Sequence, residues 1–576
     1  MKRFIFLISI LCAAGQSCKE VVDTRPLDVY TADDIWGAYS LAEGFVFTCY
    51  SNCMPYIFGH HGDAITKSIK IHPWGGAYGP EKTEGISRET DEGWDQFANI
   101  RAVNQVLANV KKSPFSQMQK NTLLGEAHFL RACIYSWLAF NFGGVQIVKN
   151  VLNPDSDFKI PRSSIKDTYD FVLADLDTAA ALLKTTADRG RATKSAAYAL
   201  QMRVGLQAGA YINDNAYYAK VKSAGEALFA IGGYSLDDYS NMFNAYASAI
   251  ASPENILIYE CKSIDMVFNS TPMQSIVCNS DNNEKVTNIS METFPLAETI
   301  EGSMSYAPTQ DLADDYLVTD IDNKEKKWDQ TSYFAKGNSV YKKMYRFRDK
   351  RFYASIIYDS VKYFANWAYL RENGNCASGI SPLNGGVIEG GGGSGSQTGY
   401  LFSKYLYQQI KLYPNTPVDF CYSVLRLGEA YLNYAEAAML LGDEETARLY
   451  ISKTYRKHGG FLNDITASGE NLKTAYKRER HVEMIFENGD RYRSLLRWGM
   501  QITGGLKAGY ENSGFVIPEL NGKIRNMAIS ADGKTYQIFE TGDKGIDLKF
   551  TPKRYLYPVP YSKIQANPLL TQNAGW

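Results

Sequence analysis

Apolar residues recur at helical spacing through most of the first half of the chain and again near its end. The spacing predicts amphipathic helices over 100–110 and 123–142, the second of which stops at Gly143-Gly144. Further helices are predicted at 163–183, 191–211, 217–231, 422–442, 444–459 and 472–487. Successive helix pairs of about 30 to 40 residues are typical of tetratricopeptide-like packing, although the chain has no strict repeat consensus.

The middle of the chain, residues 252–420, loses this periodicity and is rich in Asn, Ser, Gly, Pro and Tyr. Only short stretches such as 254–260 and 351–358 have the pattern of strands. We therefore predict an all-α fold: a scaffold of tetratricopeptide-like helix pairs that carries a large loop-rich region and a few short strands. Loops held by a rigid scaffold often carry function.

The first eighteen residues have the pattern of an export signal. Lys2 and Arg3 precede an apolar run over 4–11, and mostly small residues lead to Cys18. We predict a signal peptide over 1–17 and a lipid-carrying Cys18, because the cysteine after Gly-Gln-Ser resembles a lipoprotein cleavage site. The alternative is an ordinary secretory signal that leaves Cys18 a plain thiol. No later stretch is apolar for long enough to cross a membrane.

Charge and cysteine content exclude two classes of protein. The 61 basic and 62 acidic residues leave a net charge of -1, so the chain lacks the basic surface with which proteins neutralise phosphates, and we expect no nucleic-acid partner. Nine cysteines are sparse for 576 residues and do not indicate a disulfide scaffold. Cys49 and Cys53, four residues apart, are expected to be packed thiols on a helix.

Motifs for catalysis and metal binding are lacking. The sequence contains no Gly-x-Ser-x-Gly, His-Glu-x-x-His or Cys-x-x-Cys pattern, and its acidic pairs are too common to indicate a glycosidase. One cluster has the residue types of a metal site: His60, His61, Asp63 and His72. Their spacing matches neither a helix nor a strand that would direct all four side chains at one ion, so the cluster is interpreted as a solvated loop. We expect no enzyme activity, no cofactor and no metal site.

A sugar-binding surface requires flat aromatic faces and polar neighbours, and one loop combines them. Residues 70–85 carry Trp74 and Tyr78 among glycines that would leave both rings exposed, and Asp63 nearby could accept hydrogen bonds from hydroxyl groups. Trp94, at the start of a scaffold helix, is instead expected to pack.

Several longer motifs resemble the SusD/RagB family of lipid-anchored nutrient-uptake proteins of Bacteroidetes. The resembling segments, in the order of the family, are 125–148, 190–209, 308–321, 348–358, 398–407, 424–443, 477–499 and 555–576. Their charged residues have a structural interpretation: Arg131, Arg480, Glu483, Glu487, Arg491 and Arg497 are expected to form partly buried ion pairs and caps. The resemblance divides the mature chain into a helical region over 18–250 and a C-terminal region over 251–576 with the binding face.

The resemblance implies a function in glycan capture without catalysis, as a lid on a SusC-like TonB-dependent transporter of the outer membrane. By analogy, loops of the middle region join the N-terminal loop, which adds the candidate glycan-binding residues Trp328, Tyr333, Tyr341, Trp367 and Arg371. Lipid attachment through Cys18 would be the sole link to the membrane, on the cell surface. The alternative is a lipoprotein of the same architecture that binds peptides or proteins.

Overall fold

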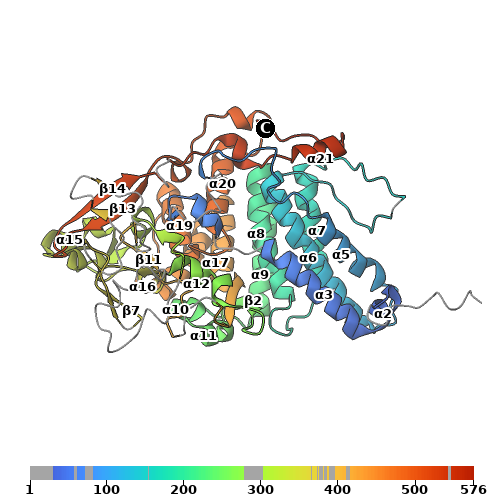
Figure 1. Ribbon diagram of the computed structural model, residues 1–576, viewed down its shortest axis with the longest axis horizontal. Coiled ribbons are helices and arrows are strands. Elements are labelled where there is room, and N and C mark those ends of the chain that lie inside the picture. Colours follow the sequence, from blue (N-terminus) through green and yellow to red (C-terminus); the bar gives the residue numbers. More distant parts are fainter. Residues whose placement is uncertain are drawn as a thin grey trace, which may run out of the picture.

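Two blocks of long helices, one from each half of the chain, form the scaffold of the protein (Figure 1). The structure, a computed structural model, describes residues 30–56, 61–71, 82–153, 155–277, 302–364, 366–372, 374, 380–381, 386–387, 396–409, 415–542 and 547–576. The N-terminal block contains α2 (Ala32–Gly37), α3 (Tyr39–Cys53), α5 (Phe97–Asn109), α6 (Gln117–Phe142), α7 (Ile165–Leu182), α8 (Lys194–Ile212) and α9 (Asn215–Ile231). The C-terminal block contains α17 (Leu427–Leu440), α18 (Glu444–Lys457), α19 (Gly469–Met484) and α20 (Asp490–Thr503), and α21 (Tyr561–Ala566) follows near the end.

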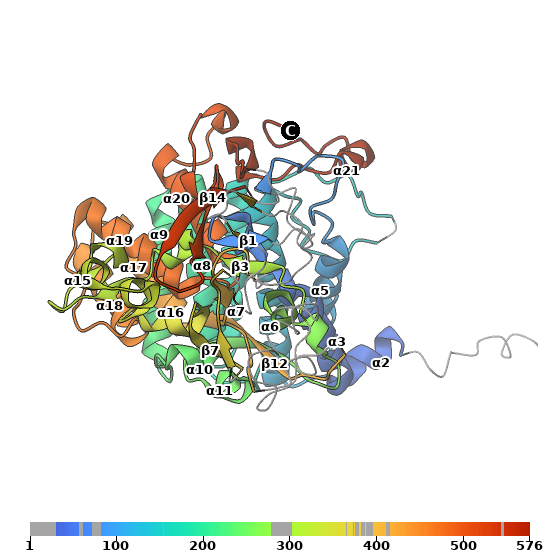
Figure 2. The same ribbon diagram turned by 60° about the vertical axis from the view of Figure 1, so that its left-hand side comes forward.

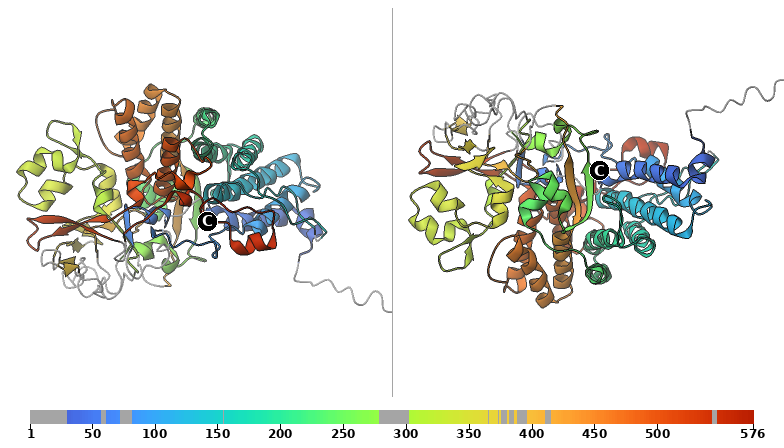
Figure 3. Two further views of the ribbon diagram at one scale, coloured as in Figure 1. Left: turned by 90° about the horizontal axis from the view of Figure 1, so that it is seen from above. Right: turned by 90° about the horizontal axis from the view of Figure 1, so that it is seen from below.

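The second part of the molecule, which we call the lobe, is made of short elements between residues 239 and 420 together with one later hairpin. Its helices are α10 (Tyr239–Phe243), α11 (Tyr246–Ala251), α12 (Pro272–Ile276), α14 (Gln310–Ala313), α15 (Ser332–Lys336) and α16 (Lys350–Ser355), and a π-helical turn, η7, covers Tyr341–Tyr345. Figure 3 shows the C-terminal helices, in orange, between this lobe and the N-terminal helices.

The described strands form antiparallel pairs. The pairs are β1 (Ile69–Ile71) with β3 (Tyr306–Pro308), β2 (Asn255–Cys261) with β12 (Phe420–Arg426), β4 (Val318–Thr319) with β5 (Glu325–Lys326), β6 (Ile356–Ile357) with β11 (Leu401–Phe402), β7 (Val361–Tyr363) with β8 (Asn366–Ala368), β9 (Ile380–Ser381) with β10 (Gly386–Val387), and β13 (Ile524–Ile529) with β14 (Tyr536–Thr541). The Lys70 ammonium donates to Thr541 Oγ1 at 3.2 Å, which places β1 beside β14, as Figure 2 shows.

The scaffold helices form where capping and close packing agree with the apolar pattern. Ser116 begins α6 with a capping box, in which its hydroxyl accepts from the Gln119 amide and the Gln119 side chain accepts from the Ser116 amide. Gly143, at φ 75°, ends the same helix. On α8, a Cβ added to Gly205 would lie 2.6 Å from Val221 of α9, so the glycine allows the two helices to approach closely.

The predicted fold class is confirmed, with a few local errors. The helix predicted over 422–442 begins only at Leu427, because residues 420–426 form strand β12 and pair with β2 far away in the sequence. Residues 351–358, predicted as strand-like, are mostly helix α16, which Asp349 caps by accepting from the Arg351 amide. Cys49 and Cys53 are buried free thiols on α3, as expected.

Two large hydrophobic cores underlie this arrangement. The larger one fills the space between the helices of both blocks, and Trp94 packs into it edge-on against Phe142, at 5.2 Å between ring centroids. The smaller one fills the lobe. Helix α19 contributes to both, since Val482 belongs to the core of the lobe and Met484 to that of the scaffold. Among the described residues, no helix combines the length and apolar character needed to cross a bilayer.

Candidate functional site

Part of the predicted site falls outside the described residues. This applies to Trp74 and Tyr78, to the lipid-attachment residue Cys18, and to His60 and His72 of the histidine cluster. The assignments of these residues stay predictions.

Asp63 lies inside the protein. It sits in the 3-10 turn η2 (His61–Ile65), is fully buried, and accepts hydrogen bonds from the backbone amides of Phe486 at 2.7 Å and Arg491 at 2.9 Å. Burial, and then the nearby carboxylate of Asp490, raise the pKa of Asp63 to about 8. The interpretation of this residue as part of a solvated loop is therefore wrong. The hydrogen bonds of Asp63 connect the N-terminal segment to the start of α20, and its carboxylate is too deeply buried to contact a ligand.

Trp328 is also buried. Its indole Nε1 donates to Asp314 at 2.7 Å, and its ring packs edge-on against Phe334 and Tyr536, with 5.3 and 5.9 Å between centroids. With 5% of its surface exposed, the ring is part of the core of the lobe. We therefore leave Trp328 and Asp63 out of the surface that we propose below.

The other candidates in the middle region lie on the lobe, and two of them belong to a group of accessible rings. We call Tyr333, Tyr341, Phe347 and Tyr353 the aromatic surface. Tyr341, Phe347 and Tyr353 expose 41%, 47% and 39% of their surface, which is high for rings of this size. Tyr333 is partly exposed and lies against Phe347 at 4.9 Å between centroids.

Contacts within the lobe hold these rings in place. Tyr341 stacks on the buried Tyr358 at 6.4 Å, and Tyr353 meets the same ring at 6.0 Å. The Tyr353 hydroxyl donates to the Tyr345 carbonyl at 2.7 Å and accepts from the Arg348 amide at 3.0 Å. Tyr341 thus has one packed face, and Tyr353 is held by an edge-on ring contact and by its hydroxyl. An exposed face that is already positioned can bind a flat apolar ligand with a small loss of side-chain entropy.

The residues Phe347 and Tyr353 were not among the sequence candidates. Both lie in the segment YRFRDKRFY (345–353), which is rich in aromatic and basic residues, and this composition was the available signal. Phe347 has a positive φ of 58°, which is unusual for a bulky residue. The Arg346 guanidinium lies 4.8 Å from the Phe347 ring centroid and supplies hydrogen-bond donors beside the rings.

Trp367 and Arg371 lie at a neighbouring hairpin, formed by β7 and β8. Trp367 exposes 45% of its surface, with the Lys362 ammonium 4.8 Å from its ring centroid. Arg371 makes a two-pronged ion pair with Asp359, at 2.6 and 3.0 Å. Arg371 therefore holds the hairpin to the body of the lobe, and one fifth of its side chain remains exposed.

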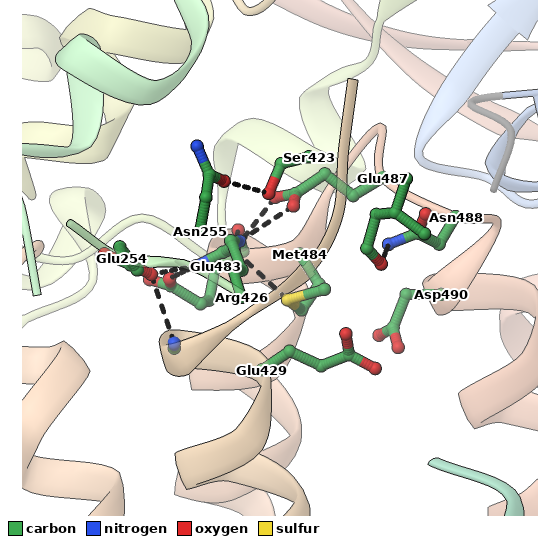
Figure 4. Close-up of polar contacts among 12 residues, drawn as sticks. Glu254, Asn255, Ser423, Arg426, Glu429, Glu483, Met484, Glu487, Asn488 and Asp490 are labelled. Carbon is green, nitrogen blue, oxygen red and sulfur yellow. Dashed lines mark hydrogen bonds and ion pairs between the residues drawn. The ribbon is translucent and has the colours of Figure 1, made fainter. Parts of the chain in front are cut away.

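The densest group of charged side chains lies deeper, where the lobe meets the scaffold, and we call it the buried ionic network. Figure 4 shows Arg426 among Glu254, Glu483 and Glu487. Arg426 donates to these three carboxylates at 2.5 to 2.9 Å. The network consists of Asp349, Arg351, Lys404, Arg426, Glu254, His458, Glu479, Glu483 and Glu487. All nine side chains are at most 3% exposed, so a substrate has no access to them.

Two shifted pKa values in this network follow from its geometry. Burial alone would lower the pKa of His458, but the carboxylates of Glu483 and Glu254, at 2.8 and 3.0 Å, outweigh it and raise the pKa to about 9. Burial lowers the pKa of Lys404 to about 8 in spite of its ion pair with Glu487 at 2.5 Å. Both groups are therefore cationic at neutral pH.

Within the described part of the chain, one group has the geometry of metal ligands: Glu254, His458 and Glu483, whose ligand atoms lie within 4.8 Å of one another. A metal-binding histidine must be neutral, whereas His458 is protonated and Arg426 already occupies both carboxylates. In this group, protonated His458 forms buried ion pairs with Glu254 and Glu483, an arrangement that does not suit a divalent cation.

The predicted ion pairs are confirmed for most of the six charged residues named from the sequence. Arg131 pairs with Asp175 at 2.8 Å, Arg480 with Asp490 at 2.5 Å and Arg497 with Glu436 at 2.7 Å. Glu483 and Glu487 belong to the buried ionic network. Arg491 contacts Glu519 only at 3.8 Å, and its amide binds Asp63.

Comparison with known proteins agrees with this architecture. The model of the SusD family matches residues 266–576, and a second model, described as starch-binding associating with outer membrane, matches residues 90–206. A SusD-like protein of Bacteroides ovatus is 22% identical over 83% of this chain and 80% of its own length.

Solved structures with the same fold cover nearly the whole chain. A SusD-like protein of Bacteroides fragilis superimposes with a TM-score of 0.74 and 24% identity, over 96% of this chain and all of that one. A SusD-like carbohydrate-binding protein of the same species gives a TM-score of 0.71 and 18% identity, over 93% of this chain and all of that one. At these identities the structural similarity establishes the fold alone.

Proposed function

The chain belongs to the SusD family, and from this premise we propose that it binds a glycan at the cell surface and delivers it, without cleavage, to a SusC-like TonB-dependent transporter. The observation that supports glycan binding most directly is the aromatic surface, with Trp367 on the adjacent hairpin. Accessible rings that are held in place suit the apolar faces of sugar rings. The exposed cationic side chains of Lys342 and Arg346 beside them can donate hydrogen bonds to sugar hydroxyls.

Binding without cleavage is supported by the carboxylates around the aromatic surface. A glycosidase needs a carboxylic acid with a raised pKa opposite a second carboxylate. Asp359 is instead paired with Arg371, and Asp320 with Lys326 at 2.7 Å. Burial raises the pKa of Asp311 to about 6, but the guanidinium of Arg525 lies between it and Asp314, at 3.5 and 2.7 Å.

Substitution of the exposed rings tests the proposed surface. A sugar that covers about 40 Å² of one ring face gains ~1 kcal/mol, which corresponds to about fivefold in Kd. We expect Tyr341→Ala and Tyr353→Ala each to weaken glycan binding by about this factor. Tyr561→Ala is the matched control, because Tyr561 on α21 is 38% exposed and α21 lies over the N-terminal helices, away from the lobe (Figure 1).

The assay is isothermal titration calorimetry with soluble glucans, xylans and mannans, followed by chromatography of each glycan after incubation. Binding by the unaltered protein, weakened by both lobe substitutions and intact glycan products, would support the proposal. Release of shortened oligosaccharides would contradict the non-catalytic role. Binding of peptides but of no glycan in the panel would favour the alternative of a peptide-binding protein.

Attachment to the outer membrane rests on the sequence around Cys18 and on the description of the second family model. In this proposal the lipid keeps the binding protein close to its transporter at a high effective concentration. We expect Cys18→Ala to abolish incorporation of labelled palmitate and to impair uptake in cells, with unchanged glycan affinity of the purified protein. Digestion of intact cells with a protease tests surface exposure.

A further inference from the structure

A small pocket inside the helical scaffold is lined by four arginines. It lies where α6, α7, α8, α17, α19 and α20 meet; α8 and α20 run side by side in the middle of Figure 1. The lining side chains that concern us are Arg203, Arg480, Arg493, Arg497, Gln207 and Tyr169, and the carboxylate of Asp490 lines the pocket as well. The pocket belongs neither to the aromatic surface nor to the buried ionic network.

Three of the four arginines have a carboxylate partner of their own. Arg203 pairs with Glu429 at 2.6 Å, Arg480 with Asp490 at 2.5 Å and Arg497 with Glu436 at 2.7 Å. The fourth, Arg493, lies over the ring of Phe140, at 5.0 Å from its centroid. Across the described part of the chain, its guanidinium forms no ion pair or hydrogen bond. Four guanidinium groups therefore face three carboxylates, each of which is already paired. Arg493 is partly exposed, and the carboxylates nearest to it, Asp490 and Glu429, belong to the other arginines.

Two further donors in the pocket lack a partner among the described residues. They are the side-chain Nε2 of Gln207 on α8 and the hydroxyl of Tyr169 on α7. Gln207 is 6% exposed and Tyr169 is 1% exposed, so bulk water cannot satisfy these groups. A buried donor without an acceptor destabilises a protein by about 1 to 3 kcal/mol. Two such donors beside a guanidinium without an ion pair therefore indicate that an acceptor occupies the pocket.

The size of the pocket limits what can satisfy these groups. Its volume is about 30 Å³, enough for one or two water molecules or one monoatomic anion and too little for phosphate or a carboxylate ligand. Water would satisfy the donors but would give Arg493 no anionic partner of its own. Burial lowers the pKa of Arg493 to about 10, with the positive charge of Arg203 as the next cause, so the guanidinium is still protonated at neutral pH.

We propose that this pocket, which we call the arginine pocket, binds a chloride-sized anion. The anion would accept from the Arg493 guanidinium, Gln207 Nε2 and the Tyr169 hydroxyl, and would balance the fourth positive charge. Because α7 and α8 come from the first half of the chain and α20 from the second, the ion would join the two blocks of scaffold helices.

The direct test is a crystal structure of the protein grown in sodium bromide and measured at the bromine absorption edge. We expect an anomalous peak within hydrogen-bond distance of Arg493. Density for water alone, with no anomalous signal in the arginine pocket, would overturn the proposal.

Thermal unfolding then separates a structural ion from an adventitious one. The full chain is compared in sodium chloride, sodium bromide and sodium gluconate at equal ionic strength, since gluconate is too large for the pocket. At a halide concentration ten times Kd, the unfolding equilibrium constant should fall about elevenfold relative to gluconate, with a corresponding rise in Tm. Equal Tm values in the three salts would mean an adventitious ion only and would also refute the proposal.

The matched variants are Arg493→Met, which removes the charge of the side chain, and Arg189→Met, whose side chain is 50% exposed and does not line the pocket. The first should lose the halide-specific rise in Tm and the second should keep it. If Arg493→Met does not fold, Gln207→Leu should weaken the rise, because it removes a neutral donor. An unchanged halide response in the variants that fold would contradict the assigned site.

Discussion

The substitution Arg426→Met is the most direct test of what the buried ionic network contributes to stability. Arg426 ends strand β12 and donates five hydrogen bonds to Glu254, Glu483, Glu487 and the Glu483 carbonyl, at 2.5 to 2.9 Å. It is 1% exposed, so no water replaces these bonds when the guanidinium is removed. Methionine fills a similar volume and supplies none of them.

The magnitude follows from the charges of the network. Its cations are Arg351, Lys404, Arg426 and His458, and they face the five carboxylates of Asp349, Glu254, Glu479, Glu483 and Glu487. Removal of Arg426 increases the buried excess of negative charge from one to two. Breaking a buried ion pair from one side costs about 3 to 5 kcal/mol, a large share of the ~5 to 15 kcal/mol that stabilises a typical domain.

The assay is urea unfolding followed by tryptophan fluorescence, with stability taken from the midpoint at unchanged slope. Arg456→Met is the control, since its side chain is 56% exposed, 3.4 Å from Asp464, and should change stability by less than ~0.5 kcal/mol. Adding Glu254→Gln to Arg426→Met restores the original charge difference, leaves His458 its partner Glu483, and should recover about 1 kcal/mol. A loss below about 1 kcal/mol for Arg426→Met alone would refute the reasoning.

Two further predictions concern packing and pH. Gly209→Val should destabilise the protein by about 1 to 3 kcal/mol in the same urea assay, because the added Cβ would lie 2.5 Å from the Tyr218 ring. The control Gly44→Ala has open space around the added Cβ and should be neutral or slightly stabilising. Equal effects of the two substitutions would refute the packing argument. The raised pKa of His458, about 9 against an ordinary 6.5, means that its stabilisation is fully present below pH 6.5 and is lost as pH rises through 9. The stability difference between the unaltered protein and His458→Gln, on the order of 3 kcal/mol at low pH, should shrink over this range in urea titrations, and a constant difference would exclude the protonated histidine.

The scaffold could be predicted from the sequence because its signals are local. Apolar spacing located helices α5 to α9, and Gly143 marked the end of α6. Helix α20 was not predicted as a separate helix. Its apolar residues do recur at helical spacing, with Leu495, Leu496 and Trp498 buried, so the sequence carried a signal that the prediction did not use. Its buried face also includes Asp490 and Arg497, which pair with Arg480 of α19 and Glu436 of α17. Strand β12 was taken for helix because its partner β2 lies far away in the sequence.

The candidate site could be predicted only in part, because exposure depends on distant segments. Trp328 and Trp367 lie in similar loop sequences. Tyr536 and Phe334 cover the Trp328 ring, whereas the Trp367 ring stays 45% exposed. Asp63 is buried by the turn between α19 and α20, more than four hundred residues later. In both cases the deciding contact is a tertiary one, for which a single sequence gives no signal.

The position of the buried ionic network explains how the proposed binding surface can be rigid although it is built from short elements. The network joins Arg351 of α16 in the lobe with Glu479 and Glu483 of α19, the helix that contributes to both cores. Charged hydrogen bonds depend on direction and distance more strongly than apolar contacts do, so they fix the orientation of the lobe on the scaffold. Because α16 also carries Tyr353 of the aromatic surface, the same ion pairs hold its exposed ring in place. We therefore expect Arg426→Met, in conditions where it remains folded, to weaken glycan binding although Arg426 is buried and contacts no ligand.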